Sequence, residues 1–240
     1  MMNFKISHWE RNDYERMIFF LKQESEEAYR LFQEKIVLSP KQILGVRLPK
    51  LRRYAKEIIK GNWNSYLKFG GNEYFEEVML EGIVIGTAKM EYQERILLTD
   101  QFLSKIDSWA ICDSFCNGFE INPQRVDAFF AHIETYLRSE NPWSVRVGLV
   151  MMLSHYMKAP YIEEILKRSE NIKNSAYYVK MANAWLISVA YINFKKQTLS
   201  FLRTSCLDDW TYHKSIQKIR ESQRVSRKEK EMLKTLKRRH

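Results

Sequence analysis

A tryptophan and an aspartate lie four residues apart in the segment Ile106-Asp-Ser-Trp-Ala-Ile-Cys-Asp-Ser-Phe115. If this segment is helical, Trp109 and Asp113 share one face, with the indole one turn before the carboxylate. Aspartate is a poor helix former, so a carboxylate inside an apolar helix needs a partner or a function. A fixed carboxylate can stabilise positive charge that develops in a reaction, and an indole face also attracts cations. The structural alternative is an ion pair with a neighbouring helix, for instance with Arg146.

The other residues that could do chemistry form no recognisable pattern. Asp107 can cap the start of the predicted helix, which is an ordinary structural role. Cys112 and Cys116 share a helix face, but no second Cys/His pair at ligand spacing accompanies them. The sequence contains no Walker A, GxGxxG, HExxH, nucleophile-elbow or zinc-deaminase motif. We therefore expect neither a metal nor a cofactor.

The elements that position these residues are predicted to be helices throughout. The 240 residues include only 8 glycines and 5 prolines, too few for the turns of a β-sandwich or barrel. Apolar residues recur at helical spacing, as at Val145, Leu149 and Met152. Proline fits the first turn of a helix, so each proline predicts a helix start. These prolines stand in the pairs Ser39-Pro40, Leu48-Pro49, Asn122-Pro123, Asn141-Pro142 and Ala159-Pro160.

The spacing predicts twelve to fourteen helices of 10–17 residues, joined by short polar loops. No long linker interrupts them, which favours a single domain over residues 1–240. The predicted fold class is all-α: an α-α superhelix (solenoid) of HEAT-like helical repeats, whose concave face could hold DNA. A globular helical bundle is the alternative, because no repeat is visible in the sequence itself.

The charge points to a polyanion as partner. The net charge is +10, and residues 195–240 contain fourteen Lys or Arg against five Asp or Glu. Such an excess suits nucleic acid first and an anionic membrane surface second, and a solvated basic tail is the structural alternative. We expect a basic C-terminal helical region at about residues 208–240, with phosphate contacts from Lys214, Lys218, Arg220 and Arg224.

Targeting signals and disulfides are not expected. The N-terminal residues lack the apolar stretch of a signal peptide, and no apolar run reaches transmembrane length. Three cysteines are too few and odd in number for a disulfide framework. We therefore predict a cytoplasmic protein with no membrane partner.

Several segments, in their order and spacing, resemble the AlkD-like DNA alkylation repair glycosylases, a family built from HEAT-like repeats. The resemblance covers roughly residues 25 to 205. It lies in Ile43-Leu-Gly-Val-Arg-Leu-Pro-Lys-Leu-Arg52, Glu77 to Gly86 with Glu81-Gly82, Ser108-Trp-Ala-Ile-Cys-Asp113, Trp143-Ser-Val-Arg-Val-Gly-Leu149 and Tyr178-Val-Lys-Met-Ala-Asn-Ala-Trp185.

The resemblance implies a set of site residues. The catalytic aspartate and two tryptophans of the family fall on Asp113, Trp109 and Trp185, and its DNA-contacting arginine falls on Arg146. An N-terminal aromatic residue that touches the lesion strand falls on Tyr29. We expect Trp109, Asp113, Arg146 and Trp185 to converge on one concave surface of a monomer. The remaining tryptophans are expected in the core: Trp9, Trp63, Trp143 and Trp210.

The activity implied is hydrolysis of the N-glycosidic bond of cationic alkylated purines, 3-methyladenine and 7-methylguanine, in duplex DNA. The resemblance also implies that the lesion is not flipped out of the duplex, in contrast to most glycosylases. One alternative is a non-catalytic DNA-binding protein of the same fold that recognises distorted or branched DNA. Another is a helical-repeat scaffold for an acidic protein.

Overall fold

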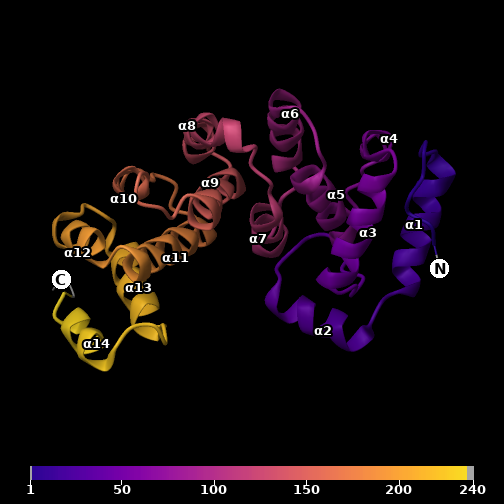
Figure 1. The fold of residues 1–240 in the computed structure, drawn as a ribbon. Coiled ribbons are helices and arrows are strands. Elements are labelled where there is room, and N and C mark those ends of the chain that lie inside the picture. Colours follow the sequence, from indigo (N-terminus) through magenta and orange to yellow (C-terminus); the bar gives the residue numbers. More distant parts are fainter. Residues whose placement is uncertain (1, 237–240) are drawn as a thin grey trace. The chain divides into compact units, whose positions relative to one another are not determined.

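The structure is a computed structural model that describes residues 2–236 (Figure 1). These residues form fourteen α-helices and one 3₁₀ turn, with no strand; a lone parallel bridge joins Gln42 to Tyr74. The all-α prediction is therefore confirmed. The helices are α1 (Arg11–Gln23), α2 (Glu27–Ile36), α3 (Leu48–Lys60), α4 (Trp63–Leu67), α5 (Phe75–Thr87), α6 (Tyr92–Leu103), α7 (Trp109–Gly118), α8 (Val126–Leu137), α9 (Pro142–His155), α10 (Ile162–Glu170), α11 (Tyr177–Asn193), α12 (Lys195–Thr204), α13 (Asp209–Glu221) and α14 (Arg227–Lys234).

The chain divides into two compact units, the first ending at Arg125 and the second beginning at Val126. In the first unit α5 packs against α3, α6 and α7. In the second unit α11 packs against α9 and α13, and also contacts α10 and α12. In both units, helices two apart in the chain lie side by side, which is the packing of stacked helical repeats. The extent of a single domain over residues 1–240 stays a prediction.

Helix α5 is the centre of the first unit. Every residue from Phe75 to Gly86 is buried, so the helix is covered on all sides. Gly82 allows this close packing, because a Cβ atom there would lie 2.6 Å from the ring of Phe102 on α6. Arg95, also on α6 and buried, donates hydrogen bonds to the carbonyls of Ile85, Gly86 and Ala88. The guanidinium thus satisfies the C-terminal carbonyls of α5, which have no partner within the helix.

The N-terminal turn of α5 holds a loop in place. The carboxylate of Glu76 accepts hydrogen bonds from the backbone N–H groups of Leu44, Gly45 and Val46 at 2.6–3.0 Å. Gly45 has a φ of 91°, a conformation that residues with a side chain rarely adopt. Burial raises the pKa of Glu76, and the three N–H donors oppose that rise. The loop around Gly45 is therefore folded about a buried carboxylate.

An ion pair joins α5 to the loop between α6 and α7. Both carboxylate oxygens of Glu81 lie 2.8 Å from Nζ of Lys105. Lys105 also donates to the carbonyl of Gly70 at 3.1 Å, and a Cβ on Gly70 would lie 2.6 Å from the Glu81 carboxylate. Burial raises the pKa of Glu81, and the nearby charge of Lys105 opposes that rise. The pair connects three segments of the first unit.

The core of the second unit lies between α9, α11 and α13. These helices bury apolar side chains such as Leu149, Leu186 and Ile216. Asn141 caps α9 by accepting a hydrogen bond from the backbone N–H of Trp143, as its place before Pro142 predicted. None of the helices within residues 2–236 is long and apolar enough to cross a membrane.

Three sequence-based predictions about local structure are wrong. Pro40 starts no helix: residues 43–47 have no regular secondary structure, and α3 begins only at Leu48. Asp107 does not cap α7, because Ser108 occupies that position and accepts from the N–H of Ile111. Of the four tryptophans expected in the core only Trp9 is buried: Trp63 and Trp143 are half-buried, and 37% of the Trp210 surface is exposed.

Candidate active site

Helix α7 has one partly exposed side, and Trp109 and Asp113 lie on it. Trp109 is the first residue of the helix and Asp113 its fifth, and both are half-buried. The residues on the opposite side, Ile111, Cys112 and Phe115, are buried in the core of the first unit. The i, i+4 spacing therefore places the indole and the carboxylate on the side of α7 that faces away from that core.

The indole of Trp109 is held by the end of α2. Its Nε1–H donates a hydrogen bond of 3.1 Å to the carbonyl of Ile36, the last residue of that helix. This carbonyl has no partner within α2, because the last carbonyls of a helix point beyond its end. One bond therefore completes α2 and sets the direction of the indole plane.

Asp107 anchors the segment that leads into α7. Its carboxylate forms an ion pair with Lys41 and accepts a hydrogen bond of 3.0 Å from Ser39 Oγ. Lys41 also donates to the carbonyl of Lys105 at 2.9 Å. The loop around residue 40 is thereby tied to the start of α7, which positions Trp109.

Tyr29 lies on α2, a helix with no fully buried residue. The guanidinium carbon of Arg47 lies 4.8 Å from the Tyr29 ring centroid, and the Tyr29 hydroxyl contacts the side-chain amide of Gln33. The exposed side chains of Leu31 and Phe32 belong to the same helix. Tyr29 thus lies on a largely exposed helix that holds the Trp109 indole at its other end.

Arg146 is buried in the second unit, where 5% of its surface is exposed. Its Nη1 donates to the carbonyl of Tyr178 at 2.8 Å, and its guanidinium carbon lies 6.0 Å from the Tyr178 ring centroid. Tyr178 also stacks on Trp143 at a centroid distance of 5.3 Å. These contacts join α9 to the start of α11, and a direct DNA contact by Arg146 stays a prediction.

Trp185 lies two turns further along α11. Tyr178, Met181 and Trp185 recur at helical spacing and are all half-buried, so they share the partly exposed side of this helix. Trp185 therefore belongs to the surface of the second unit rather than to its core. Trp109 and Asp113 belong to the first unit and Arg146 and Trp185 to the second, and the convergence of these four residues stays a prediction.

The four predicted basic residues of the C-terminal region differ in their surroundings. On α13, Lys214 donates to Gln217 at 2.8 Å, and Lys218 pairs with Glu221 at 3.0 Å. Arg220 is half-buried on the same helix, and Arg224 is exposed in the turn before α14. Residues 237–240, which include two further arginines, lie outside the described residues.

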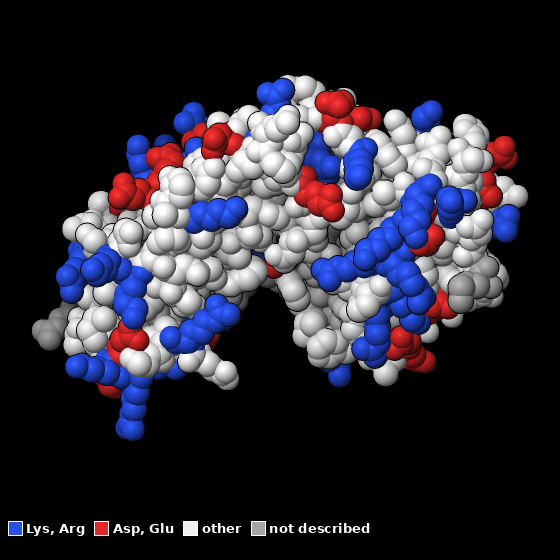
Figure 2. All heavy atoms as spheres, in the orientation of Figure 1, with Lys and Arg blue, Asp and Glu red and all other residues white. Residues whose placement is uncertain are grey.

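A basic surface on α3 was missed by the sequence-based prediction. Lys and Arg side chains cross the first unit in a band on the side where α1 to α3 lie (Figures 1 and 2). Arg52 and Lys56 are exposed, lie one turn apart on α3, and form no ion pair with any residue from 2 to 236. The first unit has 18 basic and 18 acidic residues, so its total charge gave no signal. Several of its acids, including Glu76 and Glu81, are buried in α5, which leaves the surface more basic than the composition.

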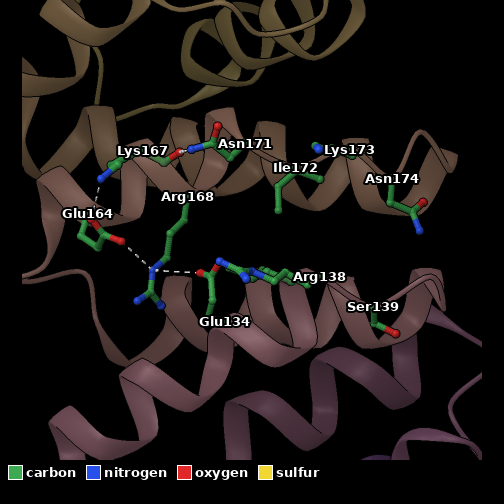
Figure 3. Close-up of a pocket in the computed structure, with 11 residues that line it drawn as sticks. Glu134, Arg138, Ser139, Glu164, Lys167, Arg168, Asn171, Ile172, Lys173 and Asn174 are labelled. Atoms are coloured by element: carbon green, nitrogen blue, oxygen red, sulfur yellow. Dashed lines mark hydrogen bonds and ion pairs between the residues drawn. The ribbon is translucent and has the colours of Figure 1, made fainter.

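A groove of about 730 Å³ in the second unit contains none of the predicted site residues (Figure 3). It lies along α8 and α10, and Arg168 reaches between Glu134 and Glu164 at 3.5 and 3.1 Å. Arg138 pairs with Glu134 as well, at 2.8 Å. Four cationic side chains and two carboxylates line the groove, and the two carboxylates are both engaged in these ion pairs. Within residues 2–236, no three His, Cys, Asp or Glu side chains are grouped so that they could hold a metal ion.

No individual curated protein matches this chain. The family model described as DNA alkylation repair enzyme matches residues 20–229, which span α2 to α13 entirely and include Trp109, Asp113, Arg146 and Trp185. Because the match covers most of the 240 residues, the chain belongs to the DNA alkylation repair enzyme family.

Proposed function

We propose that this protein is a DNA glycosylase that hydrolyses the N-glycosidic bond of cationic alkylated purines in duplex DNA. Membership of its family makes DNA the substrate class. The substrates would be 3-methyladenine and 7-methylguanine, which already bear a positive charge. The observation that carries the proposal is that Asp113 and Trp109 lie together on the partly exposed side of α7.

The proposed reaction needs no general acid. When the bond between C1′ and the purine nitrogen breaks, its electrons neutralise the cationic base, which leaves as a neutral molecule. The deoxyribose then develops positive charge, and water adds at C1′ while one proton is released to solvent. The products are a free base and an abasic site. The enzyme must therefore stabilise positive charge on the sugar rather than supply a proton.

Asp113 and Trp109 suit that requirement. A carboxylate stabilises an oxocarbenium-like transition state, as it does in glycoside hydrolysis. An indole face attracts the same charge through its quadrupole, and Trp185 would add a second face. The hydrogen bond from Trp109 to Ile36 supports the proposal, because it holds the indole before the substrate arrives. A partly exposed helix side rather than an enclosed pocket also suits a lesion that stays stacked in the duplex.

The deciding experiment measures release of 3-methyladenine and 7-methylguanine from methylated duplex DNA by chromatography. We expect wild-type protein to release both bases. We expect Asp113→Asn to reduce the rate about 10²- to 10³-fold, because the amide cannot supply the charge. Duplex affinity should change little, because the carboxylate acts only as positive charge builds on the sugar.

Asp127→Asn is the matched control, since Asp127 lies on α8 of the second unit, where it accepts a hydrogen bond from Tyr161. Its excision rate should equal that of wild type. Wild-type excision by Asp113→Asn would make the carboxylate structural. Unfolding of that variant, detected by circular dichroism, would point to a buried ion pair instead, whose loss costs about 3–5 kcal/mol.

A non-catalytic DNA-binding protein is the second candidate, favoured by the exposed basic pair Arg52 and Lys56 on α3. Such a protein would recognise distorted or branched duplexes through phosphate contacts. Strong binding to methylated DNA by the folded wild type, with no base released, would establish this function in place of the glycosylase.

A further inference from the structure

We propose that the second unit has a stacking platform for an unpaired nucleobase, formed by Tyr177 and Trp210 with Lys180 and Lys214. This site is separate from the α7 residues assigned to bond cleavage. It implies that the protein binds single-stranded DNA, or a single-stranded extension of a duplex, more tightly than an intact blunt duplex.

The platform begins with two exposed rings. Tyr177, the first residue of α11, is 60% exposed, and Trp210 on α13 is 37% exposed. Their ring centroids lie 5.8 Å apart with the planes at 67°, so the edge of one ring supports the other. Tyr178 supports Tyr177 in the same way at 5.2 Å and is itself stacked on Trp143. A chain of four aromatic rings therefore fixes the exposed Tyr177 ring in place.

Two lysines lie beside these rings. Nζ of Lys180 lies 5.9 Å and Nζ of Lys214 lies 5.5 Å from the Trp210 ring centroid. Lys180 is also paired at 3.0 Å with Asp208, the N-cap residue of α13, which connects α11 to that helix. Lys214 forms no ion pair with any residue from 2 to 236, so its charge is available to a phosphate.

Exposed aromatic rings next to a lysine that forms no ion pair fit single-stranded nucleic acid. Each unpaired base offers a flat face for stacking, and the adjoining phosphate needs a cation. Within a continuous duplex both faces of every base are covered by its neighbours, so a duplex cannot use the Tyr177 ring except at an end or a gap. The second unit has 21 basic and 11 acidic residues, which suits a polyanion rather than a basic partner.

The test uses the full-length protein and a fluorescein-labelled twelve-residue oligothymidylate, with a blunt duplex of equal length, measured by fluorescence anisotropy. We expect the single strand to bind more tightly to wild type. Tyr177→Ala should weaken that binding about 5- to 100-fold, which is the effect of losing one base–aromatic stack, and Tyr177→Phe should preserve it. Lys214→Gln should lower the slope of log affinity against log salt by about 0.7.

Phe19→Ala is the matched control, because Phe19 is 62% exposed on α1 of the first unit and outside the platform. Its affinity for the single strand should equal that of wild type. A direct readout of stacking comes from 2-aminopurine in the oligonucleotide, whose fluorescence should fall on binding to wild type but not to Tyr177→Ala.

Equal affinity of wild type for single strand and duplex would overturn the proposal, as would unchanged binding by a folded Tyr177→Ala protein. Either result would leave the excision assay on methylated duplex DNA unaffected. Conversely, absence of base release would leave the platform measurements valid, because neither Tyr177 nor Lys214 takes part in the proposed bond cleavage.

Discussion

The hydrogen bond between Trp109 and Ile36 is the residue-scale feature that links the candidate active site to its surroundings. It joins α7 to the end of α2, the helix on which Tyr29 lies. Trp109, predicted to be catalytic, is therefore bonded to the helix that carries Tyr29, predicted to contact DNA. A change that frees the indole should affect activity more than stability, because Trp109 is only half-buried.

Trp109→Phe tests this dependence. Phenylalanine keeps an aromatic face but has no N–H donor, so the ring loses its bond to the Ile36 carbonyl. We expect base excision to fall about tenfold or more, because loosely held catalytic groups lose much of their effect. Stability should fall by about 1 kcal/mol. Both quantities are measured on one preparation, by base release and by urea unfolding.

Trp63→Phe provides the comparison, since Trp63 is also the half-buried first residue of a helix in the first unit. Excision should stay at the wild-type rate in that variant. If both substitutions slow excision equally, the effect is a general loss of stability and the indole direction is unimportant.

At the residue scale, spacing alone predicted that Trp109 and Asp113 share a helix side, because a four-residue interval has only one outcome in a helix. It could not predict the acceptor at Ile36, which lies 73 positions away in the chain. The role of Asp107 was wrong for a similar reason. Its partners Ser39 and Lys41 come from a distant loop, and Ser108 is equally suited to capping.

At the scale of single elements, the loop at residues 43–46 depends on one glycine. A Cβ on Gly45 would lie 2.7 Å from Cβ of Arg30 and 2.9 Å from the carbonyl oxygen of Glu26, at a φ of 91°. Gly45→Ala should therefore destabilise the protein by about 1–3 kcal/mol. Thermal unfolding followed by circular dichroism measures the change.

Gly118→Ala is the matched variant, because Gly118 ends α7 and a Cβ atom there would meet no other atom within 4 Å. Alanine favours helix over glycine by about 0.5–1 kcal/mol, so this substitution should be neutral or stabilising. Equal losses in the two glycine variants would contradict the conformational role of Gly45.

Helix α14 is attached to α12 by an acid-sensitive contact. The pKa of Glu229 is lowered to about 2 by its hydrogen bond to Lys195 and by further bonds to Ser226. Its folded-state pKa lies below the ordinary glutamate value, so its stabilising effect is present above that value and is lost as pH falls towards 2. Glu229→Gln should lower Tm at pH 6, and this difference from wild type should shrink by pH 2.5.

The matched change is Glu231→Gln on the same helix, where Glu231 pairs with Lys234 within one turn. Exposed pairs of this kind contribute little, so its Tm should follow wild type at both pH values. A Tm difference for Glu229→Gln that stays constant between pH 6 and pH 2.5 would rule out the titration of this carboxylate as its cause.

The helical class and the cap at Asn141 were predicted from the sequence, since apolar periodicity and a cap act locally. Pro40 failed as a helix marker because its segment is fixed by distant contacts: the N–H of Gln42 bonds to the Glu73 carbonyl. The acids of α5 likewise have partners in other segments. Periodicity cannot predict a glutamate in the centre of a buried helix.

At the scale of the whole molecule, charge is divided unevenly between the two units. The second unit has 21 basic and 11 acidic residues, and so accounts for the entire net charge of +10. This asymmetry was predicted from composition. The exposed basic pair on α3 was not predicted, because buried acidic residues bring the net charge of the first unit to zero.

DNA affinity should accordingly depend strongly on salt. If Lys214 and Lys218 both contact phosphates, Lys214→Gln/Lys218→Gln should lower the slope of log affinity against log salt for duplex DNA by roughly 1.8. Substitution is preferable to removing residues 214–240, because that truncation would also delete the buried Ile216 and Ile219. Anisotropy titrations across a salt series measure the slope.

Arg138→Gln serves as the control within the same unit, because Arg138 is highly exposed but paired with Glu134. Its slope should match that of wild type. An unchanged slope in the folded double variant would show that α13 is merely solvated, and the pair Arg52 and Lys56 on α3 would then be the next residues to neutralise.

The buried carboxylate of Glu76 has a consequence for hydrogen–deuterium exchange. Residues 43–47 have no regular secondary structure, yet the amides of Leu44, Gly45 and Val46 all donate to this one group. Release of these amides requires the first turn of α5 to move, so their exchange should be as slow as that of α5 itself. In a Glu76→Gln protein they should exchange faster while the amides of α11 keep their protection. The loop would then behave kinetically as part of the α5 core, although it has no helical or strand structure of its own.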